Sequence, residues 1–106
     1  MPQWHLYLIR TRLGTLYTGI TTDVQRRLAE HTGKGNRGAK YLRAKGPLML
    51  VYQVEIGSQS LALQAEKRIK TLAKPQKEKI IAAQLDSERL LAMIDLQPHP
   101  SPLTGL

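Results

Sequence analysis

Five side chains in the first two thirds of the chain are of the types that phosphodiester hydrolysis needs. Such hydrolysis requires an activated water, stabilisation of the charge that develops on the phosphate oxygens, and help for the leaving oxygen. A divalent ion such as Mg²⁺ supplies the last two and needs only one or two carboxylates, because it keeps several waters. The candidates are Tyr7, Tyr17, Arg27, His31 and Glu66.

Two of these candidates, Arg27 and His31, share one face of an expected helix. Arg27 carries a planar, permanently charged fork that matches a phosphate, and it lies on the same face as Val24 and Leu28. His31 follows one turn later, and an imidazole can accept or relay a proton near neutral pH. The competing interpretations are a solvated helix charge for Arg27 and a histidine favoured by the helix macrodipole for His31.

Tyr7 and Tyr17 are expected to meet across a hairpin and to direct their hydroxyls to one site. A phenol with an ordinary pKa near ~10 needs help from a metal ion or from His31 to act as a general base. Either tyrosine could fill that role, and ordinary strand tyrosines are the alternative. Gly19 is expected to let backbone and substrate approach closely.

Glu66 is the candidate metal ligand. Taken alone, it is better explained as a helix-surface glutamate paired with Lys70, because residues four apart are neighbours on a helix. Only its occurrence together with the other four candidate residues favours metal binding.

The elements that must position these residues follow from hydrophobic periodicity and turn signals. The chain predicts the order strand, strand, helix, strand, helix, helix, with a further helical segment before the C-terminal tail. The expected strands span 4–9, 15–20 and 48–56, and the expected helices span 23–31, 58–72, 74–85 and 87–96. The fold class is therefore α/β of the α+β type, with a small three-stranded, largely antiparallel sheet flanked by helices.

Two local features refine this prediction. Thr22 is expected to cap the first helix, with Gln25 returning the bond in a capping box. The strand over 48–56 is apolar on both faces in its first half, so we expect it to be the central strand.

The charge balance indicates a polyanionic partner. Sixteen basic and eight acidic residues give a net charge of +8, a field that favours nucleic acid over a membrane surface. Four glycines and five basic residues lie within 33–46, a composition suited to moulding round a phosphate backbone, although a solvated loop is the alternative. The expected nucleic-acid-binding residues are Lys34, Arg37, Lys40, Tyr41, Arg43 and Lys45, with Tyr41 able to stack on an unpaired base.

Cysteine is absent from the chain, which excludes disulfides, thiolate metal sites and cysteine nucleophiles. No leader peptide or membrane-spanning run is evident, so a cytoplasmic location is expected.

The ordered set of motifs resembles the GIY-YIG nuclease domain, and more narrowly its small stand-alone YhbQ-like branch. The motifs are His5-Leu6-Tyr7, Tyr17-Thr18-Gly19, Asp23-Val24-Gln25-Arg26-Arg27-Leu28, His31, Gly33-Lys34-Gly35, Gly38-Ala39-Lys40 and the segment from Leu61 through Glu66 to Lys70. The resemblance covers roughly 3–83. It implies that Glu66 holds one divalent ion, Mg²⁺ or Mn²⁺, and that Arg27 stabilises the scissile phosphate. Two features depart from the family pattern: Ile20 stands where many members have lysine, and a late supporting asparagine has no counterpart.

Two functions compete on this basis. The first is a metal-dependent endonuclease acting on DNA, structure-directed or weakly sequence-specific, in repair or recombination, with a possible targeting protein and as a monomer or weak dimer. The alternative is a non-catalytic nucleic-acid-binding module that uses the basic surface, and RNA is not excluded as the ligand. We expect a nuclease-like domain over 1–96 and a Pro-rich tail over 97–106.

Overall fold

A three-stranded antiparallel sheet forms the middle of the molecule. The computed structural model describes residues 2–32 and 47–96. Its strands are β1 (Trp4–Arg10), β2 (Leu16–Thr21) and β3 (Met49–Gly57), in the spatial order β2-β1-β3. The expected fold class, strand count and hairpin are confirmed, and both strand pairs are antiparallel.

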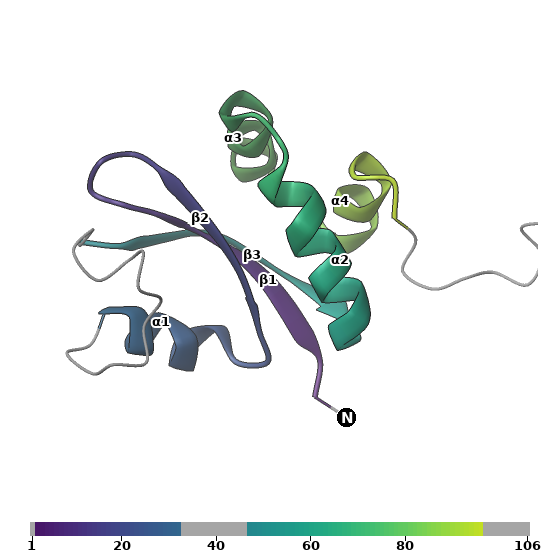
Figure 1. Ribbon diagram of the computed structural model, residues 1–106, viewed down its shortest axis with the longest axis horizontal. Helices are drawn as coiled ribbons and strands as arrows, with labels where there is room; N and C mark the ends of the chain where they lie inside the picture. The colour runs from purple at the N-terminus through teal and green to yellow at the C-terminus, as the bar shows by residue number, and fades with distance from the viewer. Residues whose placement is uncertain (1, 33–46, 97–106) are drawn as a thin grey trace, which may run out of the picture.

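Helices cover both faces of this sheet (Figure 1). The helices are α1 (Val24–Thr32), α2 (Gln59–Lys70), α3 (Lys74–Ala83) and α4 (Ser87–Met93). Leu6 and Leu8 pack in a core with α2, α3 and α4, whereas Tyr7 and Ile9 pack with Val24 of α1. Successive side chains of a strand point to opposite faces, so α1 covers one face and the other three helices cover the other. No helix of the described residues is long and apolar enough to cross a membrane.

The prediction that the third strand is central was wrong, because β1 is the central strand and β3 lies at an edge. The residues from Leu6 to Ile9 are buried without interruption, whereas Met49 on β3 is 63% exposed. The early part of β3 is apolar on both sides because Leu50 joins the α1 core while Val51 packs on the opposite core. An edge strand covered by helices on both faces has the same apolar pattern as a central one.

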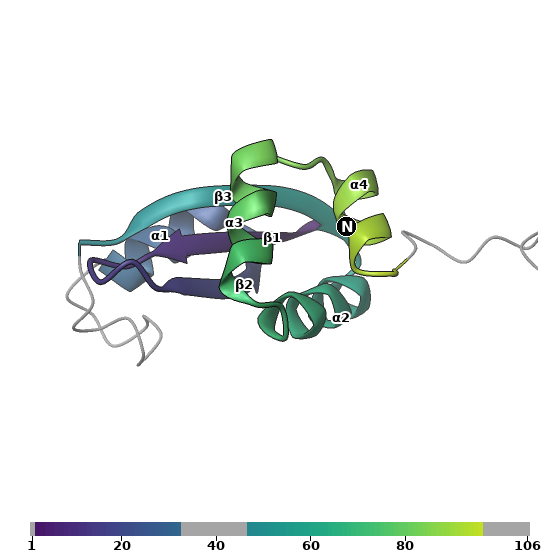
Figure 2. The ribbon, with the colours of Figure 1, turned by 90° about the horizontal axis from the view of Figure 1, so that it is seen from above.

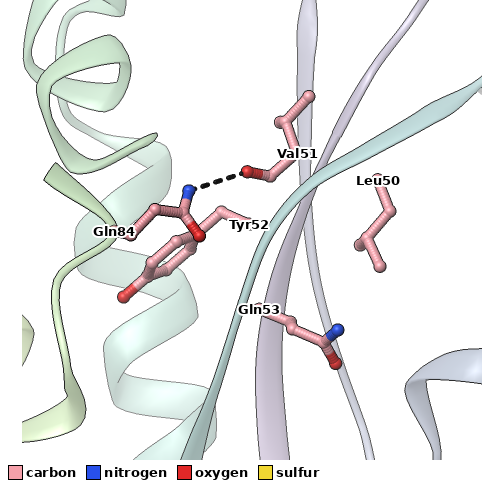
Figure 3. A pocket seen from close by; sticks show the side chains of 5 residues that line it. All are labelled: Leu50, Val51, Tyr52, Gln53 and Gln84. Atoms are coloured by element: carbon pink, nitrogen blue, oxygen red, sulfur yellow. Dashed lines mark hydrogen bonds between the residues drawn. The ribbon is translucent and has the colours of Figure 1, made fainter. Parts of the chain in front are cut away.

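A register shift in β3 gives Gln84 a structural role. Leu8 pairs with Tyr52 and Ile9 pairs with Leu50, so Val51 is skipped in the ladder, as in a β-bulge. The Gln84 side chain donates to the carbonyl oxygen of Val51 at 3.1 Å, across a small hollow at this edge (Figure 3). The edge carbonyl is thereby satisfied from within the chain.

The first helix begins one residue later than expected. The backbone N–H of Arg26 donates to Asp23 Oδ1 at 3.1 Å, so Asp23 caps α1 and the predicted capping box of Thr22 with Gln25 is wrong. Thr21 Oγ1 accepts the Asp23 N–H at 3.1 Å, which fixes the chain as it enters the helix. Asp and Thr are both good caps, and the preceding strand decides which of them reaches the helix end.

The later helices follow the sequence prediction closely. Ser58 caps α2 by accepting the Leu61 N–H at 3.2 Å, and Pro75 lies in the first turn of α3. Two bonds of 2.7 Å from the Arg10 guanidinium to the Glu78 carboxylate tie α3 to the end of β1. Helix α4 ends at Met93, earlier than the expected Leu96.

Candidate functional site

Tyr7, Tyr17 and His31 form a compact cluster on the α1 face of the sheet. The Tyr7 hydroxyl and His31 Nε2 share a hydrogen bond of 2.9 Å. The ring centroid of Tyr17 lies 6.4 Å from that of Tyr7 and 5.5 Å from that of His31, the latter in an edge-on arrangement. The two tyrosines meet diagonally, because Tyr17 pairs with Ile9 while Tyr7 pairs with Gly19. The sequence-based expectation that the tyrosines and His31 share one site agrees with this geometry.

Gly19 makes room for the ring of Tyr7. A Cβ atom added at Gly19 would lie 2.5 Å from Tyr7 Cζ and would collide with the hydroxyl as well. Tyr7 therefore leans across β2 with its hydroxyl over Gly19. The expectation that Gly19 lets a substrate approach closely stays an expectation. The structure gives another reason for the glycine, because any side chain here would displace a tyrosine of the cluster.

Helix α1 supplies the second side of the site. Val24 is buried against the sheet and His31 is 5% exposed, so the helix face predicted from sequence is the inward face. The side chain of Arg27 is 28% exposed and its Nη1 donates to Glu30 Oε1 at 2.9 Å. The largely buried guanidinium of Arg27 is therefore paired with the carboxylate of Glu30, which is itself largely buried.

The electrostatics keep the Tyr7 phenol and the His31 imidazole neutral. Burial, and next the neighbouring Tyr17, raise the pKa of Tyr7 to about 12 although Arg27 opposes the rise. Burial, and next the charge of Arg27, lower the pKa of His31 below its ordinary value of 6.5. At neutral pH the cluster therefore contains a protonated phenol bonded to a neutral imidazole, a pair in which a proton can move along a hydrogen bond.

Glu66 approaches the cluster from α2. That helix packs mainly against β2 and β1 and lies toward the β2 side of the sheet (Figure 2). The Glu66 side chain is 19% exposed, and its charge is among the influences that raise the pKa of Tyr7. Lys70 Nζ lies 3.4 Å from Glu66 Oε2. The ion pair that the i,i+4 spacing predicts is present, and Glu66 is also close enough to act on Tyr7.

A known domain family matches the part of the chain that contains all these site residues. The sequence profile of the GIY-YIG catalytic domain matches residues 3–79 of the chain. The chain belongs to the GIY-YIG family. This membership places it in a nuclease superfamily, and the predicted resemblance is confirmed.

Named relatives place the chain within one branch of the GIY-YIG family. A UPF0213 protein of Yersinia pestis (strain Pestoides F) is 55% identical over 93 residues, which cover 88% of this chain and 93% of the relative. A UPF0213 protein of Yersinia pseudotuberculosis (serotype O:3, strain YPIII) gives the same values. The solution structure of a UPF0213 protein from Bacillus halodurans matches with a TM-score of 0.51 and 29% identity, covering 90% of this chain and 99% of that one.

The donor set fits a cation that keeps most of its own water. Within residues 2–32 and 47–96 no three His, Asp or Glu side chains gather as a metal site. Mg²⁺ binds through one or two carboxylates and substrate phosphate oxygens, so the Glu66 carboxylate, whose charge acts on the Tyr7 phenol, is a compatible donor. A site closed by protein ligands alone, as for structural zinc, does not fit these residues.

The structure also shows what the sequence interpretation missed. Glu30, the partner of Arg27, was not singled out, although its i,i+3 spacing from Arg27 was a readable signal. The six residues of the expected phosphate-tracking loop, from Lys34 to Lys45, lie outside the described residues. That part of the prediction remains a prediction.

Proposed function

We propose that this GIY-YIG domain is a divalent-metal-dependent endonuclease that hydrolyses DNA phosphodiester bonds. The observation that carries the proposal is the hydrogen-bonded pair of Tyr7 and His31, with Tyr17 beside it and the charges of Arg27 and Glu66 acting on it. An acid, a base and a phosphate-binding cation in one place are the components of phosphoryl chemistry. The net charge of +8 supports a polyanionic substrate.

In this proposal the Tyr7–His31 pair handles the proton of the attacking water. A phenol whose pKa is about 12 is a poor base by itself. It can instead relay: the water's proton passes to the Tyr7 oxygen while the Tyr7 proton passes to His31 Nε2. The product of the relay is an imidazolium, and Tyr7 never has to exist as a free phenolate. Tyr17, in edge contact with His31, orients the ring and the incoming water.

Arg27 and Glu66 handle the phosphate. Arg27 can exchange the Glu30 carboxylate for the scissile phosphate, because a guanidinium fork binds both anions in similar geometry. Glu66, assisted by the tyrosine hydroxyls, would hold the Mg²⁺ or Mn²⁺ ion. When bound, the ion would stabilise charge on the phosphate oxygens and on the leaving oxygen.

The proposed substrate range is broad within DNA. Basic side chains contact phosphates, and phosphate contacts position a nucleic acid without reading its bases. We therefore propose structure-directed or weakly sequence-specific cutting, with a role in repair or recombination, and with any further targeting supplied by a partner protein. A monomer or weak dimer in the cytoplasm is sufficient for such a role.

A second candidate function rests on one observation, the ion pair of Glu66 with Lys70. A carboxylate that already has a lysine partner has a structural use without any metal ion. In that case the cluster is a remnant, and the domain binds nucleic acid without cutting it.

The deciding experiment compares cleavage by the wild type, Glu66→Gln and Glu88→Gln. Glu88 is an exposed glutamate in the first turn of α4 and provides the matched control. Labelled duplex, single-stranded, flapped and branched DNA are incubated with Mg²⁺ or Mn²⁺, and binding is measured in parallel. We expect metal-dependent cutting by the wild type and Glu88→Gln, and binding without cutting by Glu66→Gln. Binding without cutting by all three proteins would instead support the non-catalytic function.

A further inference from the structure

A basic hollow lies on the side of α2 away from the tyrosine cluster. Its volume is about 360 Å³, and it is lined by Gln64, Lys67, Arg68 and Thr71. These side chains present two cations, an amide and a hydroxyl, with no carboxylate among the four. A concave surface of hydrogen-bond donors and positive charge is suited to an anion rather than to a metal ion or an apolar ligand.

One of the two cations is held in place by the protein. Arg68 Nη1 donates to the carbonyl oxygen of Ile94 at 2.8 Å and to that of Asp95 at 3.2 Å, at the end of α4. Both bonds use the same nitrogen, so the donors on Nε and Nη2 make no hydrogen bond to the described residues. A guanidinium fixed in this way loses little conformational entropy when it binds a ligand. Lys67 is exposed and adds an adjustable point charge beside it.

The position of the hollow relative to Glu66 follows from helix geometry. Glu66, Lys67 and Arg68 are consecutive on α2, and successive residues are rotated by about 100°. Arg68 therefore lies on the opposite flank of the helix from Glu66, with the buried face of Ala65 and Ile69 between the two flanks. A helix with its side chains is about 10–12 Å across, and backbone phosphates of one strand advance about 3.4 Å per nucleotide along the duplex axis. The distance between the two flanks of α2 therefore corresponds to about three nucleotides of one strand.

We propose that the hollow binds a backbone phosphate of the nucleic acid about three nucleotides from the scissile phosphate, so that the substrate crosses α2. The scissile position rests on the proposed function, whereas phosphate binding in the hollow does not. This contact positions the strand over Glu66 and reads no bases. The residues that make this contact are not those of the glycine-rich segment 33–46, for which the sequence predicts the same task.

A nucleic acid fits the hollow better than an acidic protein does. Lys70 on α2 and Lys74 at the start of α3 are also exposed, so positive charge continues past the C-terminal end of α2. An extended positive surface matches a polymer with a charge at every step. An acidic polypeptide is the competing ligand and forms one arm of the test.

Thiol labelling can locate the contact, because the natural chain has no cysteine. Lys67→Cys and the matched control Lys79→Cys, on exposed α3, are reacted with a maleimide in the absence of divalent ions, which prevents cleavage. Duplex DNA, duplex RNA and poly-glutamate are added in turn, and anisotropy confirms that each nucleic acid is bound. We expect bound duplex to slow labelling severalfold at position 67 and little at position 79. Equal protection at both positions, no protection at position 67, or equal protection by poly-glutamate would overturn the proposal.

The salt dependence of binding provides a second, independent readout. Loss of one phosphate contact reduces the slope of log affinity against log salt by about 0.9 for B-form DNA, a change of about threefold in affinity between about 50 and about 200 mM salt. We expect this reduction for Lys67→Gln and not for Lys79→Gln. Protection at position 67 without any cutting by the wild type would refute the nuclease but keep the phosphate site. Cutting with an unchanged slope for Lys67→Gln would refute the phosphate site but keep the nuclease.

Discussion

The two faces of β1 differ in what they bury. On one face, Leu6 and Leu8 belong to a large aliphatic core with α2, α3 and α4. On the other, Tyr7 and Ile9 share a small cluster with Val24 of α1, and the space beside them holds Tyr17 and His31. The large core provides hydrophobic stabilisation in proportion to its buried apolar area. The face of β1 toward α1, called the small face below, has less of that stabilisation because it buries polar groups. Strand β1 is shared with the large core and therefore keeps these polar groups in place.

The largest effect is expected from Tyr7→Phe, which removes one hydroxyl from the small face. General acid–base groups contribute about 10²–10⁴-fold to rate, so we expect cleavage to fall by that factor. The loss of one hydrogen bond changes the free energy of unfolding by only about 1 kcal/mol. Single-turnover cleavage and urea unfolding would measure the two quantities.

Tyr52→Phe is the matched control for this change. Tyr52 is also buried, its pKa is also raised by burial to about 12, and its hydroxyl donates to Leu85 O at 2.6 Å, but it lies on the large-core face. We expect a similar loss of stability and unchanged cleavage. Equal cleavage losses in the two variants would mean that the faces do not divide chemistry from stability.

The next effect is expected from Leu8→Ala, on the large-core face. Leu8 is fully buried, and Leu-to-Ala changes in cores cost about 2–5 kcal/mol of unfolding free energy. We expect this loss in denaturant unfolding, with cleavage per folded molecule close to that of the wild type below the unfolding midpoint. A folded Leu8→Ala protein with cleavage reduced as strongly as in Tyr7→Phe would contradict the division.

Gly19→Ala should perturb the small face by crowding it. Its new methyl group collides with the Tyr7 ring, and overpacking of this kind costs about 1–3 kcal/mol. We expect cleavage to fall as well, because Tyr7 must leave its position beside His31. A double-mutant cycle with Tyr7→Ala tests the cause: the cost of Gly19→Ala should shrink markedly when the ring is absent. An unchanged cost would place the strain elsewhere.

Local signals in the sequence were sufficient for most of the fold. Periodicity located the strands and helices, and Ser58 and Pro75 marked helix starts because caps and first-turn prolines act within a few residues. The choice of Asp23 over Thr22 as a cap was not readable, because it depends on how β2 leads into α1. The central position of β1 was not readable either, because strand order is a property of long-range pairing.

The site was partly predictable for the same reason. The i,i+4 spacing placed Arg27 and His31 on one helix face, and the hairpin placed Tyr7 near Tyr17. The close packing of Gly19 on Tyr7 depends on the cross-strand register and on the direction in which the ring leans. Neither property is encoded in residue spacing, so only the three-dimensional structure reveals why a glycine stands there.

The smallest effect is expected in the pH dependence set by His31. Burial, and next Arg27, lower the pKa of His31 below its ordinary 6.5, so the neutral imidazole that accepts a proton persists below that pH. The acid limb of kcat/KM should therefore lie below pH 6.5 and disappear from the residual activity of His31→Gln. For stability, the unfolded chain binds more protons than the folded chain in this range, so the free energy of unfolding should decrease as pH falls from about 6.5 to the folded pKa.

NMR titration of the His31 ring can separate the two causes of this shift. Arg27→Gln removes a positive charge but leaves the ring buried, so the pKa of His31 should rise part of the way toward 6.5. A full return to 6.5 would make Arg27 the main cause, and no change would leave burial alone. Only the partial rise fits a cluster in which the small face both excludes water from His31 and holds a cation beside it. The same cation would then favour a neutral imidazole before the reaction and meet the phosphate during it.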